Sequence, residues 1–265
     1  DAQFLEPSFP TIAGSGANGA VVHYVAKPES AATVDQSRML LVDSGAQYLD
    51  GTTDATRTMH FGAPTLAQRD AFTRVLKGHI ALDTAVFPQG TPGFVLDAFA
   101  RRHLWADRKD YGHGTGHGVG AALNVHEGPQ SISPRFTNME PLRPGMIVSN
   151  EPGYYEPGAY GVRIENLLLV ETLDDDAASD DSVDNDDQRP PPAGKQYLKF
   201  RKLTQIPIDT SCLRVELLEE SEIAWLDAYH REVHERLAPL LADDPGALEW
   251  LEAKCRPVRE VWGSE

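Results

Sequence analysis

The sequence contains little cysteine and no long apolar run. Only Cys212 and Cys255 occur among its 265 residues. Two cysteines do not make the disulfide framework of a small secreted domain, so we expect a reducing, cytoplasmic environment. No apolar stretch approaches the ~20 residues that a helix needs to cross a bilayer. The composition therefore predicts neither a disulfide-stapled module nor a membrane protein.

Positive charge is also scarce. The formal net charge is −16, which argues against nucleic acid or an anionic membrane as a partner. Nine acidic residues and no basic residue fall between Glu171 and Asp187, and a proline-rich tract follows at 189–194. This composition predicts a disordered surface insertion at 171–195, with a partner-binding segment as the alternative. The remaining chain, 41% hydrophobic overall, is long enough for one large domain or two small ones.

Hydrophobic spacing predicts an α+β protein, with helices packed on a mostly antiparallel sheet. The expected helices span about 64–86, 94–105, 216–241 and 245–254, and the expected strands span 20–25, 39–42, 145–150, 160–170 and 197–208. The last two helices would form a C-terminal extension.

A predicted hairpin brings two aspartates together. An apolar run ends at Asp43, a turn signal follows at Asp50-Gly51, and the chain returns through a threonine-rich strand that contains Asp54. Pairing the two aspartates directly would centre the turn ahead of Asp50-Gly51, so we expect a bulge or a wider loop. Carboxylates this close repel unless a cation lies between them. Arg57 could supply the charge, but a divalent cation is the stronger candidate; the alternative is that both aspartates only cap turns.

Further candidate ligands follow along the chain. His113 and His117 lie in a glycine-rich loop, Glu151 ends a predicted strand, and Glu165 lies in an apolar strand where a buried acid needs a partner. The proposed ligand set is Asp43, Asp54, His117, Glu151 and Glu165. Four carboxylates match the charge of two divalent cations, and hard oxygen ligands favour Mn²⁺, with Co²⁺ or Zn²⁺ as alternatives.

Five motifs in this order resemble a known family. They read Asp-Ser-Gly-Ala-Gln-Tyr-Leu-Asp-Gly-Thr-Thr-Asp-Ala-Thr-Arg-Thr from Asp43, His-Gly-Thr-Gly-His-Gly-Val-Gly from His113, Asn-Val-His-Glu-Gly-Pro from Asn124, Glu-Pro-Gly-Tyr-Tyr from Glu151 and Gly-Val-Arg-Ile-Glu-Asn from Gly161. Together they are similar to the catalytic domain of Xaa-Pro aminopeptidases (aminopeptidase P) of the eukaryotic cytosolic type. The resemblance runs from about Phe9 to Tyr229, interrupted by the acidic segment. It implies the pita-bread fold, two Mn²⁺ ions per subunit, and removal of an N-terminal residue that precedes proline.

The resemblance also implies roles for particular residues. Asp43, Asp54 and Glu165 would ligate one or both metals, and His117 and Glu151 would complete one metal's shell. The family's other site histidines match His23, His113 and His126. We expect a catalytic domain at 1–210 and a helical extension at 211–265 that could contribute to a homodimer contact. The family's N-terminal domains have no room here, so we expect a fragment or a short form.

The expected reaction is metal-assisted amide hydrolysis by a hydroxide that bridges the two metals. Glu151 would carry a proton from the water to the leaving proline nitrogen, and His126 and His23 would hydrogen-bond the carbonyl oxygen. His113 would line the proline pocket, and Arg163 would orient the ligand carboxylates. The residues alone leave simpler readings open: a buried core histidine for His23, a strand-end carboxylate for Glu151 and an ion-pair partner of Glu165 for Arg163. Tyr154 and Tyr155 could pack the core or wall the pocket.

Three other functions compete with this prediction. A prolidase would cleave Xaa-Pro dipeptides and needs a cationic group for the substrate carboxylate. A binding module of the same fold would have lost its ligands, whereas all five are present here. The acidic, proline-rich segment at 171–194 could instead act as an interaction scaffold.

Overall fold

The computed structural model describes residues 3–173 and 196–263 of the chain. Most of the predicted insertion, at 174–195, lies outside the described residues. Glu171 and Thr172, which we assigned to it, instead end a strand and pair with Lys199 and Leu198. In the described part, no helix is long and apolar enough to cross a membrane.

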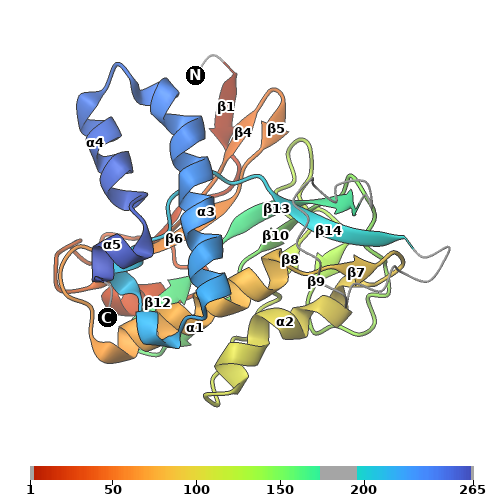
Figure 1. Ribbon diagram of the computed structural model, residues 1–265, viewed down its shortest axis with the longest axis horizontal. Helices are drawn as coiled ribbons and strands as arrows, with labels where there is room; N and C mark the ends of the chain where they lie inside the picture. Colours follow the sequence, from red (N-terminus) through yellow and green to blue (C-terminus); the bar gives the residue numbers. More distant parts are fainter. Residues whose placement is uncertain (1–2, 174–195, 264–265) are drawn as a thin grey trace, which may run out of the picture.

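The predicted hairpin forms the centre of a three-stranded antiparallel sheet. Strand β3 (Met39–Ser44) pairs on one side with β2 (Ile12–Ser15) and on the other with β6 (Ala55–His60). Beyond it, β4 (Ala46–Tyr48) and β5 (Gly51–Thr52) carry the hairpin outward, and β1 (Phe4–Pro7) pairs with β4. These three outer strands project from the top of the molecule in Figure 1.

A second antiparallel sheet has the strand order β10-β13-β14-β7. Its strands are β7 (Phe87–Pro88), β10 (Ile147–Asn150), β13 (Asn166–Thr172) and β14 (Tyr197–Lys202). Two short pairs accompany it, β8 (Gly116–His117) with β9 (Ser131–Ile132), and β11 (Gly153–Glu156) with β12 (Tyr160–Arg163). All the described ladders are antiparallel, as the sequence predicted.

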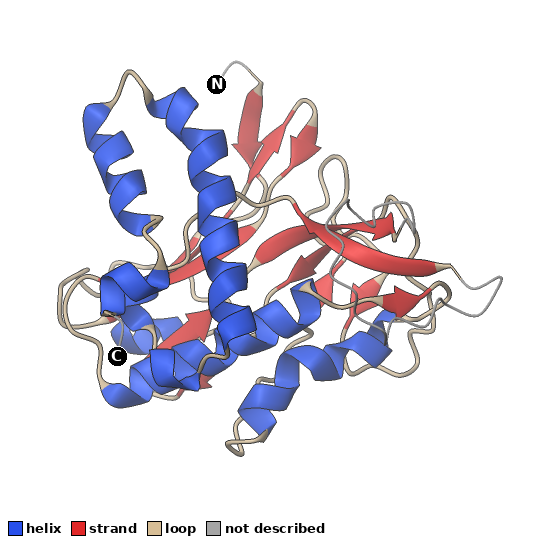
Figure 2. Cartoon of the chain, in the orientation of Figure 1, coloured by secondary structure: helices blue, strands red, loops and turns tan. Residues whose placement is uncertain are grey.

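Two helices of the first part of the chain pack against each other and against the strands. Helix α1 (Leu66–Asp83) begins with a capping box between Thr65 and Gln68, which satisfies free backbone N–H groups at its start. Helix α2 (Gly93–Trp105) contacts α1. The helices α1 and α3 cross in front of the strands in Figure 2.

The C-terminal part is helical, as predicted. It contains α3 (Glu220–Leu237), α4 (Pro245–Lys254) and α5 (Val258–Trp262); the 3-10 helix η5 (Ala238–Leu241) connects α3 to α4, and a short turn connects α4 to α5. Leu226 and Tyr229 of α3 are fully buried in one hydrophobic cluster with Phe72 of α1 and Val162 of β12. Fully burying one such apolar side chain contributes roughly 1.5–3 kcal/mol. The extension is therefore packed into the main core.

Three predicted strands differ from the structure. The strand expected at 197–208 ends at Lys202. Residues 20–25 form no strand. Ala20 ends the 3-10 helix η1 (Gly16–Ala20), and a turn follows it, in which Asn18 donates to the Tyr24 hydroxyl and Tyr24 donates to the Ser30 carbonyl oxygen. The strand expected at 160–170 is two strands, β12 and β13, which belong to different sheets. Glu165 lies at the break between them.

Candidate metal centre

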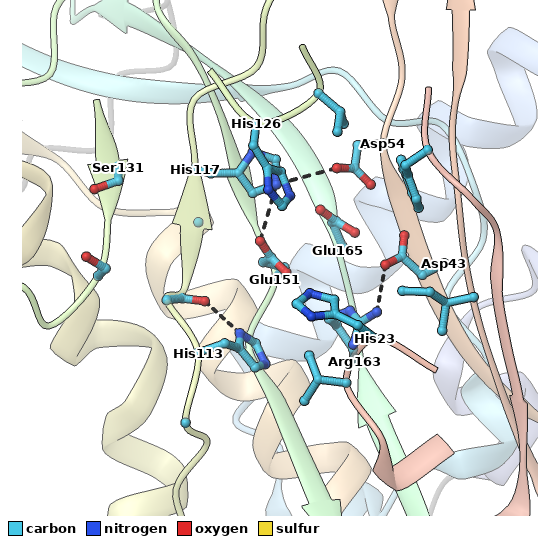
Figure 3. A pocket seen from close by; sticks show the side chains of 18 of the residues that line it. His23, Asp43, Asp54, His113, His117, His126, Ser131, Glu151, Arg163 and Glu165 are labelled. Carbon is cyan, nitrogen blue, oxygen red and sulfur yellow. Dashed lines mark hydrogen bonds and ion pairs between the residues drawn. The ribbon is translucent and has the colours of Figure 1, made fainter. Parts of the chain in front are cut away.

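The five predicted ligands meet in one cleft of about 1150 Å³. The other predicted site residues, His23, His113, His126 and Arg163, line the same cleft. Figure 3 shows their side chains pointing toward one another from strands and loops that are distant in the sequence. The structure thus brings together every residue that the sequence assigned to the site.

The hairpin places both aspartates on one face without the bulge that we expected. Its register is continuous from Asp43↔Thr56 to Gln47↔Thr52, with a turn at Leu49 and Asp50. Asp54 lies two residues before Thr56, so its side chain shares the face of Asp43 as a diagonal neighbour. The close crossing at this point needs glycine, because a Cβ on Gly45 would stand 2.0 Å from the Thr53 carbonyl oxygen.

Ligand atoms cluster in two overlapping groups that share Glu165. Atoms of Asp43, Asp54 and Glu165 lie within 4.8 Å of one another, as do atoms of His117, Glu151 and Glu165. A third group joins Asp54, His117 and His126 at the same spacing. A carboxylate common to two groups is the arrangement that two neighbouring divalent cations require.

His117 presents a free ring nitrogen to the carboxylates. Its Nδ1 donates to the Gly118 carbonyl oxygen at 2.9 Å, so Nε2 carries the lone pair. Nε2 lies 3.4 Å from oxygens of both Asp54 and Glu151 (Figure 3). Burial opposes protonation of His117, but the two carboxylates outweigh it, so the pKa of His117 lies above its ordinary value.

A serine that sequence reasoning missed connects His117 to Glu151. The Ser149 hydroxyl accepts from the His117 backbone N–H at 2.9 Å and donates to Glu151 Oε1 at 3.1 Å. The contact depends on Gly116, where a Cβ would stand 1.9 Å from the Ser149 carbonyl oxygen. Ser149 sits two residues before Glu151 on a strand, and that spacing was the only signal that could have identified it.

The carboxylate cluster has too little positive charge of its own. Burial raises the pKa of Glu151 to about 7, and it raises the pKa of Asp43 above its ordinary range despite a nearby arginine. Burial, followed by repulsion from Glu151 and Asp54, raises the pKa of Glu165 well above its ordinary value. Asp43 Oδ1 is buried without a hydrogen-bond partner. This set of oxygen donors has too few cationic side chains around it to balance its negative charge. It therefore fits divalent metal ions.

Arg163 is the arginine that pairs with the cluster. Its Nη2 donates to Asp43 Oδ2 at 2.7 Å and its Nε donates to Thr56 Oγ1 at 3.0 Å. The alternative reading of Arg163 as the ion-pair partner of Glu165 is wrong, because its ion pair is with Asp43. Glu165 Oε2 instead accepts from Thr56 Oγ1 at 2.7 Å.

Tyr155, whose role the sequence left undecided, packs against the hydrophobic core behind His113 and does not itself line the cleft. Its hydroxyl accepts from Arg163 Nη1 at 2.8 Å and lies 2.8 Å from His113 Nε2. His113 Nδ1 donates to the Gly114 carbonyl oxygen, so Nε2 accepts from Tyr155. Burial lowers the pKa of His113 to about 4 and raises the pKa of Tyr155 to about 12. A neutral imidazole therefore lines this side of the cleft, and a neutral phenol holds it from behind.

The two remaining histidines lie at the open side of the cleft. His126 is exposed, its ring centroid is 4.0 Å from that of His117, and burial by its surroundings lowers its pKa. His23 is also exposed and lies in the turn after η1, so the reading of it as a buried core histidine is wrong. Figure 3 shows both rings facing the carboxylates.

Comparison with known families decides the classification. A model described as metallopeptidase family M24 matches residues 1–172, and a model of the C-terminal region of that family matches residues 196–258. The chain belongs to metallopeptidase family M24. The five motif segments from Asp43 to Asn166 all fall within the first match.

Curated M24 relatives include plant and fungal proteins. Aminopeptidase P2 of Arabidopsis thaliana is 56% identical over 96% of this chain, which spans 34% of that protein. A probable Xaa-Pro aminopeptidase P of Laccaria bicolor is 52% identical over 95% of this chain, which spans 37% of that protein. The chain thus spans little more than a third of the length of these relatives.

Solved M24 structures show the pita-bread fold for this chain. The X-prolyl aminopeptidase of Caenorhabditis elegans, described as a cytosolic enzyme with a di-nuclear active site, superposes with a TM-score of 0.86 at 37% identity. That match covers 97% of this chain and 40% of the other. The prolidase of Pyrococcus furiosus gives a TM-score of 0.57 at 32% identity and covers 63% of this chain and 48% of the other.

Proposed function

We propose that this M24 chain is the catalytic part of a metal-dependent Xaa-Pro aminopeptidase. The observation that carries the proposal is the meeting of five ligand side chains with three histidines in one cleft. The near-complete superposition on an X-prolyl aminopeptidase and the curated relatives named aminopeptidase P support the choice of activity. The proposed substrates are peptides with an N-terminal Xaa-Pro sequence.

Asp43, Asp54 and Glu165 would hold one or both of two divalent cations, and His117 and Glu151 would complete one coordination shell. Oxygen-rich ligands favour Mn²⁺. When bound, such cations supply Lewis-acid activation of water and of the scissile carbonyl. The position of His117 Nε2 between Asp54 and Glu151 and the unpartnered Asp43 Oδ1 support this ligand assignment.

The protein's own groups would position the peptide and move the proton. Glu151, oriented by the Ser149 hydroxyl, would take a proton from the attacking water and deliver it to the proline nitrogen. His126 and His23 would donate hydrogen bonds to the carbonyl oxygen as its negative charge develops. His113, held by Tyr155, would line the proline side, and Arg163 would fix the orientation of Asp43.

The peptidase proposal is tested by comparing Xaa-Pro-Xaa tripeptides with Xaa-Pro dipeptides, using the chain loaded with Mn²⁺. We expect cleavage of the Xaa-Pro bond in the tripeptide and little cleavage of the dipeptide. Preference for the dipeptide would favour a prolidase, the second candidate. No cleavage of either substrate by the metal-loaded chain would contradict both.

We also propose a cytoplasmic location. Cys212 and Cys255 are both free thiols, which suits a reducing compartment, and the superposed nematode enzyme is described as cytosolic. The homodimer contact through the C-terminal helices stays a prediction.

A further inference from the structure

Arg57 is a buried cation that the proposed reaction does not use. It follows Thr56, the residue whose hydroxyl holds the Glu165 side chain, and it is 6% exposed. Its Nη1 donates to the Glu165 carbonyl oxygen at 2.6 Å, and its Nη2 donates to Asn166 Oδ1 at 2.7 Å. Arg57 therefore grips the backbone on which a proposed metal ligand stands.

The other side of the same guanidinium is held by the C-terminal part of the chain. Arg57 Nη2 donates to the Ile206 carbonyl oxygen at 2.7 Å and to the Tyr229 hydroxyl at 2.9 Å. Tyr229 is fully buried on α3, and its hydroxyl in turn donates to the Ile206 carbonyl oxygen at 2.8 Å. One planar side chain thus joins Glu165 to α3.

Glu165 needs such support because it belongs to no strand. It lies at the break between β12 and β13, where no ladder fixes its backbone. Its N–H donates to the Thr56 carbonyl oxygen at 3.1 Å, and Arg57 holds its own carbonyl oxygen. The carboxylate that both ligand clusters share is therefore placed by β6 and, through Arg57, by the C-terminal helix.

The charge of Arg57 is buried without an ionic partner among the described residues. In the described residues its guanidinium donates only to neutral oxygens of carbonyls, the Asn166 amide and the Tyr229 hydroxyl. A buried charge without an ionic partner is costly. The hydrogen bonds to these neutral oxygens compensate the burial of Arg57, so its position is tightly constrained.

We propose that Arg57 and Tyr229 are positioning residues through which the C-terminal region, 196–258, keeps Glu165 in place to bind metal. This inference rests on the proposed metal centre. It gives the C-terminal helices a role in metal affinity that is separate from their contribution to the core. Lysine cannot replace Arg57 in this role, because an ammonium group lacks the planar fork that reaches Glu165, Asn166 and Tyr229 together.

The test is titration of the metal-free 265-residue chain with Co²⁺. Calorimetry measures the affinity, and the visible absorption of the bound ion reports its coordination. The variants are Arg57→Lys and Tyr229→Phe. The control is Glu222→Gln, which breaks the ion pair between Lys77 of α1 and Glu222 of α3 and touches no proposed ligand. Circular dichroism and thermal unfolding of each variant report whether it folds.

We expect Arg57→Lys to weaken Co²⁺ binding roughly 10- to 100-fold, as loss of a group that orients a metal ligand does. Tyr229→Phe should weaken Co²⁺ binding less than Arg57→Lys does. Both variants should change the absorption spectrum of the bound Co²⁺ in the same direction. Glu222→Gln should lower the unfolding temperature and keep the wild-type affinity and spectrum. If Arg57→Lys fails to fold, Tyr229→Phe decides, because it removes only the hydroxyl through which α3 holds Arg57.

Wild-type affinity and spectrum in folded Tyr229→Phe and, where it folds, Arg57→Lys would overturn the inference and leave the metal centre intact. An equal loss of affinity in Glu222→Gln would also overturn it, because general loosening of α3 would then explain the effect. No Co²⁺ uptake by the wild-type chain would overturn the proposed metal centre itself.

Discussion

The metal cleft and the seam between α1 and α3 both bury charged groups, but they balance charge in different ways. In the seam, Lys77 pairs with Glu222, and Lys202 lies 3.6 Å from Asp83, so each carboxylate faces its own ammonium group. In the cleft, four carboxylates share one paired arginine and one imidazole. A seam whose charges match pairwise serves stability, whereas a cluster left short of cations is suited to binding them.

Removing the proton-transfer group in the cleft should have the largest effect of any change. That effect should be on peptide hydrolysis and not on the stability of the fold. Glu151→Gln preserves the shape of the side chain but removes the group that accepts a proton. We expect peptide hydrolysis to fall by a factor of about 10² to 10⁴, with the fold unchanged by circular dichroism. Glu222→Gln, the same chemical change in the seam, should keep its activity. Appreciable residual turnover in Glu151→Gln would rule out the assignment of Glu151.

Breaking the seam should give the opposite result. Glu222→Gln leaves Lys77 buried beside an uncharged amide, which should lower the free energy of unfolding by about 3 kcal/mol. Urea unfolding at neutral pH measures the change. An unchanged midpoint would show that the seam's ion pair does not stabilise the fold.

Supplying cations should stabilise the cleft and leave the seam unaffected. Mn²⁺ at about 100 times its dissociation constant should raise the free energy of unfolding by about 2.7 kcal/mol for each ion bound, because it binds the folded chain alone. The increment should be the same in wild type and in Glu222→Gln, although the latter starts from a lower stability. The measurement is thermal or urea unfolding with chelator and with added Mn²⁺. An increment that vanished in Glu222→Gln would contradict the separation of the two regions.

Acidification should lower the free energy of unfolding by a smaller amount, through a buried histidine beside the seam. His230 of α3 is buried, and its Nε2 accepts from the Ile208 N–H at 3.1 Å, so it is neutral in the folded chain. Burial lowers the pKa of His230 from 6.5 to about 4. Between these values the unfolded chain binds a proton that the folded chain does not, so stability falls as pH falls, by about 1.4 kcal/mol per unit for this group.

His230→Gln should keep a hydrogen-bond acceptor for the Ile208 N–H. It should remove the proton that the unfolded chain takes up and the folded chain does not. The slope of stability against pH, measured by urea unfolding between pH 5 and 6, should be shallower than in wild type by that amount. Equal slopes in the two proteins would show that His230 does not contribute to acid sensitivity.

The residues that meet in the cleft could be predicted because each stands where local sequence is informative. Asp43 ends an apolar strand, His117 lies between glycines, and Glu165 is an acid among apolar neighbours. The helices were predicted to within a few residues, since α1 and α2 carry apolar side chains at helical spacing. The split of 160–170 into two strands was missed because both halves are apolar and only pairing partners distinguish them.

The contacts behind the ligands could not be predicted. Tyr155 reaches Arg163 on the paired strand and His113 in a distant loop, and nothing in its own segment marks that role. Arg57 was considered only as a charge between the aspartates, whereas it faces Glu165 and Tyr229. Such partners depend on tertiary packing, which a local pattern does not encode.

The most direct test of the charge imbalance in the cleft is the number of divalent cations that the metal-free chain binds. Native mass spectrometry and elemental analysis after loading with Mn²⁺ give this number. The structure predicts two ions per wild-type chain, and fewer in Asp54→Asn, which removes a carboxylate from two of the three ligand groups. A wild-type chain that binds no ion, or an Asp54→Asn chain with unchanged metal content, would contradict the account.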